Sequence, residues 1–202
     1  MAWSTIVQSA ALVVDADYEA FLSASDPIII SLNPRELLSL TFNIDSVGTT
    51  DDIEILVLGG HKVGADADLD GFTSTTDVEL ETAVHPIGAD DEFNGYYLAM
   101  ITSGNARGDV RLITDSVAAD DGVTLDHAQK GNAAAADPYR LYRLRKMAEF
   151  TLDATTAIDE DNPMNGGILV QGVPEVIVMC RRDGSTNAHL VYMSFEKDGV
   201  SA

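Results

Sequence analysis

The sequence has a single cysteine, few basic residues and no long hydrophobic run. The lone thiol, Cys180, excludes an internal disulfide and any metal site built from several cysteines. Because Cys180 lies in the apolar run at residues 176–180, we expect it to be a buried structural thiol. No apolar stretch approaches the roughly 18 residues that a membrane span needs, and the first residues have no signal-peptide pattern. The sequence therefore predicts a protein that is made in a cytoplasm and stays soluble.

Positive charge is scarce. The 202 residues include 33 acidic and 12 basic side chains, which gives a formal net charge of −21. Binding to nucleic acid or to an anionic membrane needs a cationic surface, so this composition disfavours both partners. An acidic surface keeps a protein hydrated, and its self-repulsion weakens in a salty medium, where screening acts over about 8 Å or less. With 46% hydrophobic residues, the chain is expected to fold rather than to stay disordered.

The sequence also lacks the residue patterns of common catalytic sites. It has no glycine-rich phosphate loop and no nucleophile elbow around a serine. No two of the four histidines have metal-ligand spacing; these are His61, His85, His127 and His189. We therefore predict no catalytic residues and a protein that is not an enzyme.

What the chain does contain is a series of short strand-like segments separated by turn residues. Residues 37–44 alternate, with Leu38, Leu40 and Phe42 on one face and polar residues on the other. The next strand, at residues 53–58, is predicted to end at Gly59 and Gly60, and a polar connection follows over residues 61–77. Residues 15–22 could form a short helix. The spacing is typical of an all-β fold, an antiparallel β-sandwich that is Ig-like or jelly-roll-like. The other strands are predicted at residues 28–32, 76–80, 96–102, 110–114, 123–125, 139–144, 146–152, 168–172, 175–181 and 188–196.

Residues 94–127 predict three short strands joined by two turns, a β-meander. The runs are NGYYL (94–98), ITSGNARGDVRLITD (101–115) and, after another turn and strand, DPYRLY (137–142). Together they resemble a small β module that is common in structural proteins of tailed bacteriophages. Arg107, Gly108 and Asp109 depart from that pattern, which usually has a glycine and a small polar residue at this turn.

The two ends of the chain carry a second resemblance, to the two halves of a β-sandwich of phage virion proteins. The runs that carry it are LNPRE (32–36), GTTDD (48–52), RRDGST (181–186) and FEKDG (195–199). The expected organisation is an N-terminal arm at 1–25, a discontinuous sandwich at 26–63 and 146–202, and an inserted β-meander module at 64–145. Exposed hairpin tips tolerate such insertions.

One loop has the ligand spacing of a calcium site. Asp66, Asp68, Asp70, Gly71 and Asp77 match positions one, three, five, six and twelve of a calcium loop, where carboxylates converge around a glycine turn. No amphipathic helix flanks the loop, however, and Asp77 also begins a predicted strand. A calcium site and a solvated turn both stay open, and no other cofactor is expected.

Two features could form an interface. Arg140, Arg143, Arg145 and Lys146 place four of the twelve cations within seven residues, where they could bind an acidic patch on a partner or balance charges within their own chain. Trp3 could anchor the N-terminal arm on a neighbouring subunit or pack against its own domain.

The resemblance implies a structural protein of a phage virion that is made in the host cytoplasm. The function we expect is that of a capsid decoration or cement protein that binds major capsid protein subunits as a homo-oligomer, with a trimer as one option. A tail, neck or fibre-adaptor protein is the first alternative. A calcium-dependent or carbohydrate-binding β module is the second.

Overall fold

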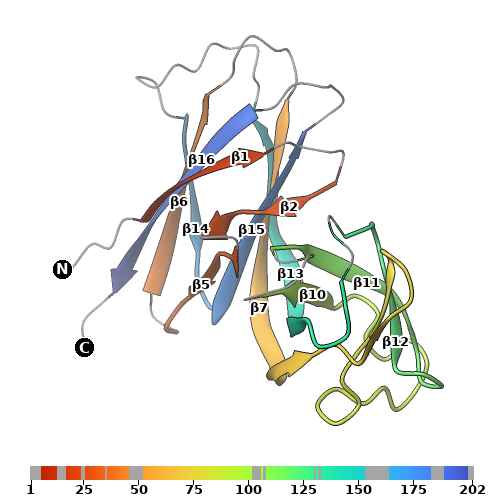
Figure 1. The fold of residues 1–202 in the computed structure, drawn as a ribbon. Helices are drawn as coiled ribbons and strands as arrows, with labels where there is room; N and C mark the ends of the chain where they lie inside the picture. The colour runs from red at the N-terminus through yellow and green to blue at the C-terminus, as the bar shows by residue number, and fades with distance from the viewer. Residues whose placement is uncertain are drawn as a thin grey trace. The chain divides into compact units, whose positions relative to one another are not determined.

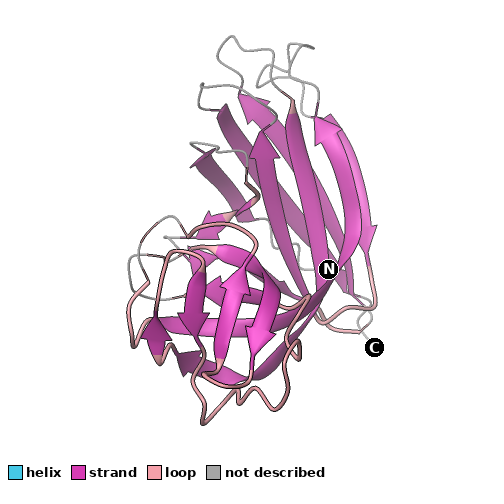
Figure 2. Ribbon diagram, turned by 90° about the vertical axis from the view of Figure 1, so that its right-hand side faces the viewer, coloured by secondary structure: helices cyan, strands magenta, loops and turns pink. Residues whose placement is uncertain are grey.

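The computed structural model describes residues 6–12, 17–23, 26–34, 36–45, 52–101, 106, 108–129, 131, 133–152, 164–182 and 189–199. Every helix or strand assigned within these ranges is a β-strand, and the strand pairs are antiparallel (Figures 1 and 2). The predicted all-β class is therefore confirmed.

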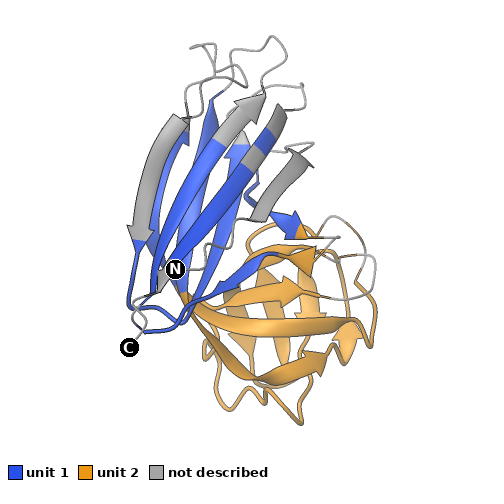
Figure 3. Cartoon of the chain, turned by 90° about the vertical axis from the view of Figure 1, so that its left-hand side faces the viewer, with its two compact units in different colours: residues 1–22, 28–59, 145–202 blue, residues 23–27, 60–144 orange. Residues whose placement is uncertain are grey.

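The chain divides into two compact units (Figure 3). Unit 1 contains residues 1–22, 28–59 and 145–202, and unit 2 contains residues 23–27 and 60–144. Two long strands, β7 (Ile53–Asp68) and β13 (Pro138–Leu152), contribute residues to both units.

Unit 1 is built from two sheets. One has four strands in the order β1-β16-β6-β14; their bounds are Ile6–Leu12, His189–Gly199, Glu36–Asp45 and Met164–Val170. The other sheet contributes β15 (Glu175–Arg182), which lies next to β7. This strand also pairs with two short strands, β2 (Glu19–Ala20) and β5 (Ile29–Ser31).

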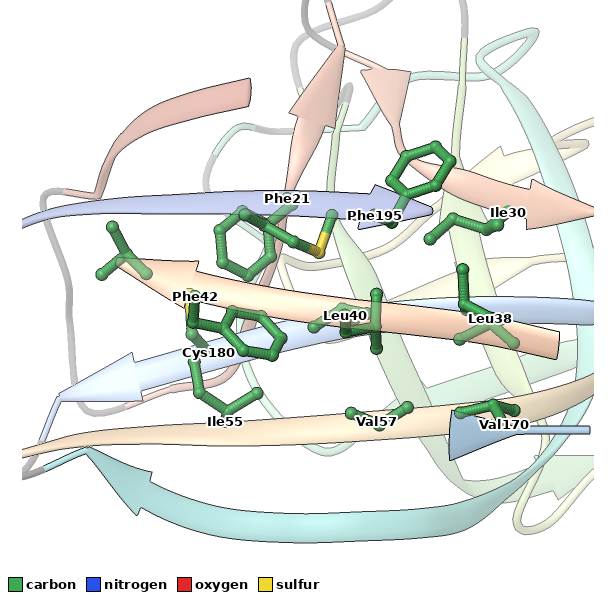
Figure 4. Packing of buried hydrophobic residues seen from close by; sticks show 14 of the residues in the cluster. Phe21, Ile30, Leu38, Leu40, Phe42, Ile55, Val57, Val170, Cys180 and Phe195 are labelled. Carbon is green, nitrogen blue, oxygen red and sulfur yellow. The ribbon is translucent and has the colours of Figure 1, made fainter. Parts of the chain in front are cut away.

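The core of unit 1 lies between these sheets. Leu38, Leu40 and Phe42 of β6 are buried, as their predicted alternation requires. They belong to one cluster with Ile55 of β7 and with Cys180 of β15, which is fully buried as predicted (Figure 4). Alternating apolar residues from two facing sheets form the core of a β-sandwich.

Unit 2 contains the predicted meander. Its strands follow the order β13-β10-β11-β12-β9-β8 and curve around a second core (Figure 2). The bounds of β10, β11, β12, β9 and β8 are Tyr97–Met100, Val110–Val117, Gly122–Leu125, Asp77–Glu79 and Gly71–Phe72. A register shift between Ile113 and Asp115 marks a bulge in β11. A separate two-stranded ribbon joins β3 (Leu22–Ser23) and β4 (Asp26–Pro27).

Several predicted boundaries are wrong. Gly59 and Gly60 do not end a strand, because β7 continues through them to Asp68 and replaces the first half of the predicted polar connection. The two strands predicted at 139–144 and 146–152 are the single strand β13. Both errors concern β7 and β13, which are neighbours in the sheet. A Cβ on Gly60 would collide with the carbonyl oxygen of Arg143, so this glycine permits a close backbone approach within the sheet.

The N-terminal segment is a strand of the chain's own sheet. Residues Ile6–Leu12 pair with β16, from Ile6 opposite Phe195 to Leu12 opposite His189. The helix considered at 15–22 is wrong, because Glu19 and Ala20 form β2. Trp3 lies outside the described residues.

Candidate interaction surfaces

The first acidic residue of the candidate calcium loop is held by two cations of unit 2. Arg140 donates two hydrogen bonds to the Asp66 carboxylate, from Nε to Oδ1 at 3.0 Å and from Nη2 to Oδ2 at 2.9 Å. Lys62 Nζ lies 2.7 Å from the same Oδ1. These cations, Arg140 foremost, lower the pKa of Asp66 to about 2. Asp66 thus joins the end of β7 to β13.

The other three aspartates are engaged in different places. Asp70 accepts hydrogen bonds from the backbone N and the hydroxyl of Thr82, at 3.0 and 3.2 Å. Asp77 accepts hydrogen bonds from three hydroxyl groups, which lower its pKa, that of Ser74 most strongly. The side chain of Asp68 is exposed, and its backbone N–H donates to Glu81 at 3.2 Å.

These four carboxylates are not gathered into one group. Within the described ranges, no set of three or more His, Cys, Asp or Glu side chains is arranged to hold a metal ion. Calcium binding stays a prediction from the sequence alone.

Three of the four basic residues of β13 have partners within their own units. Besides the Arg140 pair, the guanidinium of Arg143 lies 5.8 Å from the ring centroid of Tyr96 in unit 2. Lys146 Nζ lies 2.7 Å from Oε2 of Glu149 in unit 1, and Arg145 is exposed. These contacts fit the charge-balancing alternative, and the interface role of the four residues remains a prediction.

A row of polar side chains that the sequence did not single out crosses four neighbouring strands of unit 1. Tyr18 comes immediately before β2, Arg181 lies on β15, Glu54 on β7 and Glu149 on β13, which follow one another in the sheet. The Tyr18 hydroxyl lies 3.2 Å from a Glu54 oxygen and 2.8 Å from a Glu149 oxygen. Arg181 Nε donates to Glu54, and its guanidinium lies 4.6 Å from the Tyr18 ring centroid.

Arg181 and the neighbouring Lys146 together balance the two carboxylates of this row. Burial, followed by the hydrogen bond to Glu149, raises the pKa of Tyr18, so the phenol stays neutral and able to donate. Lys146, followed by Tyr18, lowers the pKa of Glu149 and keeps it ionised. The sequence signal that could have indicated this row was a single charged residue between apolar ones, such as Glu54 between Ile53 and Ile55. These residues link neighbouring strands and present polar groups at the surface.

Unit 2 has a buried polar chain that the sequence also did not reveal. His85 is 3% exposed and Tyr139 is fully buried. Tyr139 accepts a hydrogen bond from the Glu81 backbone N–H at 3.1 Å, and its hydroxyl lies 2.8 Å from His85 Nδ1. The second ring nitrogen, His85 Nε2, lies 2.9 Å from the Val63 carbonyl oxygen. Because a carbonyl only accepts, His85 Nε2 donates to Val63, and the Tyr139 hydroxyl can then donate to Nδ1.

Comparisons with known proteins find only weak structural similarity. No protein-family model and no curated protein matches the sequence. Two solved structures resemble the chain weakly, each at 9% sequence identity. One is the VP16–VP17 complex, a complex of the two major capsid proteins of bacteriophage P23-77, with a TM-score of 0.24 over 97% of this chain and 99% of that chain. The other is VP17, a capsid protein of the same bacteriophage, with a TM-score of 0.21 over 98% of both chains. TM-scores this low do not establish a common fold.

The described part of the chain contains no helix long and apolar enough to cross a membrane.

Proposed function

We propose that this protein is a structural component of a tailed-phage virion and that it decorates the capsid by binding across neighbouring major capsid protein subunits. The observation that carries the proposal is the arrangement of the runs that resemble the phage β module. Tyr97 of the first run pairs with Leu112 of the second and with Tyr142 of the third. Runs that lie up to 45 residues apart are thus hydrogen-bonded neighbours in one sheet. This supports their interpretation as parts of a single module.

The proposed action is mechanical and needs no reactive group. A bound copy would bury surface on two capsid subunits at once and oppose their separation. An interface of standard size, about 1,600 Å², supplies useful affinity, and repeated copies add avidity. The net charge of −21 would keep the decorated particles dispersed.

The decisive experiment adds purified protein to phage heads that lack it. We expect saturable co-sedimentation with heads, on the order of hundreds of copies per particle, and a higher temperature of head disruption, because each copy bridges subunits. Tails purified from the same phage serve as the control. Binding to tails or necks at about a dozen copies or fewer would favour the tail, neck or fibre-adaptor alternative. Binding to neither would overturn the proposal.

A further inference from the structure

Most edge strands of the described sheets have a feature that discourages pairing with another chain. Such features are short length, charge, proline and bulges. At the ends of the larger sheet, β2 and β8 have two residues each, and β2 contains Glu19. The edge strand β5 has three residues. β14 is longer, but a register shift between Met164 and Ile168 interrupts its pairing with β6.

The edge strand β1 has none of these features. Its seven residues, IVQSAAL, pair with β16 in an unbroken register. They contain no charged residue and no proline, and residues 1–14 contain no Asp, Glu, Lys or Arg although 22% of the chain is charged. Among the described strands, β1 pairs only with β16 and ends its sheet (Figure 1). Its outer row of backbone N–H and C=O groups is thus a template for a further strand.

We infer that this edge binds a second copy of the chain, with β1 pairing antiparallel to β1 of the partner subunit about a twofold axis. An antiparallel pair of identical strands is self-complementary, so the contact closes as a dimer. Electrostatics favour this place, because two chains that each carry a charge of −21 repel across most of their surface. An uncharged strand places no like charges opposite one another. A larger ring would need β1 to join a different edge strand, and the register shift in β14 makes that strand a poor partner.

This inference goes beyond the proposed virion role, because it concerns contact between copies and not the particle that they cover. Sedimentation velocity of the purified chain tests it. We expect a species of twice the 21.5-kDa chain mass. Ser9 is the middle residue of β1, and in the twofold pair Ser9→Lys sets two lysines near each other and weakens dimerisation at least tenfold. The matched control is Ser31→Lys on the edge strand β5, which should leave the dimer intact.

A monomeric wild-type chain would overturn the inference, as would equal effects of the two substitutions. Should Ser9→Lys fail to fold, hydrogen exchange of the wild type decides. Amides of residues 6–12 should gain protection as the protein concentration rises, whereas those of β14 and β5 should not; protection independent of concentration would contradict the dimer. A monomer that binds phage heads would overturn this inference alone, and a dimer that binds neither heads nor tails would overturn the virion role alone.

Discussion

Arg140 and Asp66 lie 74 residues apart in the sequence and form a two-point ion pair between β13 and β7, with donor–acceptor distances of 3.0 and 2.9 Å. The pair predicts a specific pH dependence. Because the folded-state pKa of Asp66 is lowered from 3.8 to about 2, its contribution to stability is present above about pH 4 and is lost as the pH falls through about 2.

We expect Asp66→Asn to remove that part of the acid sensitivity. The side chains of Asp66 and Arg140 are 42% and 34% exposed, so solvent screening reduces the loss in unfolding free energy at neutral pH to about 0.5–1 kcal/mol. Urea unfolding at intervals from pH 2 to 7 measures it. Asp68→Asn, on the same strand, is the matched control. Equal effects of the two substitutions would contradict the assignment.

Gly60 predicts a backbone constraint. A Cβ at this position would collide with the Arg143 carbonyl oxygen and lie 2.9 Å from the Leu144 Cα, and neither backbone atom can move without disturbing the sheet. We expect Gly60→Ala to lower the unfolding free energy by about 2–4 kcal/mol. Gly88→Ala is the control, because its nearest contact, at 3.3 Å, is the flexible Glu92 side chain. Thermal unfolding of both variants is the measurement, and a tolerated Gly60→Ala would refute the close approach.

The Tyr139 hydroxyl predicts a cost for an unmade hydrogen bond. Tyr139→Phe keeps the ring but leaves the Glu81 N–H and His85 Nδ1 without their partner inside unit 2. We expect a loss of about 1–3 kcal/mol in unfolding free energy. Tyr97→Phe is the comparison, since the structure assigns no hydrogen bond between that hydroxyl and a described residue and we expect a smaller effect. Chemical denaturation of the two variants distinguishes them. Equal losses of unfolding free energy would count against the hydrogen bonds of the buried Tyr139 hydroxyl.

The excess of acidic residues predicts stabilisation by salt. With 33 acidic and 12 basic side chains, the folded chain repels itself more than the expanded one does. Raising the salt from about 0.01 to 0.15 M shortens the screening length from about 30 to 8 Å, and we expect the unfolding free energy to rise by about 1 kcal/mol or more. Sodium and potassium chloride should act alike, because screening does not depend on the cation. A stability that is flat with salt would contradict this prediction.

The alternation of apolar residues predicted the strands of this protein better than the turn residues predicted where the strands end. Alternation placed Leu38, Leu40 and Phe42 on the core face correctly, because one buried face imposes a period of two on a strand. The glycine pair in β7 does not end the strand, contrary to the prediction from sequence. Glycine marks both a turn and a close backbone approach, and only the position of β13 distinguishes the two.

The polar contacts could not have been predicted from local sequence. Tyr18 reaches Glu149 across 131 residues, and His85 reaches Tyr139 across 54. Such pairs depend on which strands become neighbours and in which register. The aspartate spacing of the calcium loop was visible, but the spacing does not reveal that Arg140 binds Asp66 or that three hydroxyl groups bind Asp77.

The most direct test of the proposed role is a cryo-electron microscopy reconstruction of the source particle with every copy of this chain located and counted. A decoration protein should lie on the outside of the head, across boundaries between major capsid subunits, in copy numbers on the order of hundreds. A chain found at about a dozen copies or fewer on the tail or neck, or absent from the particle, would contradict that role.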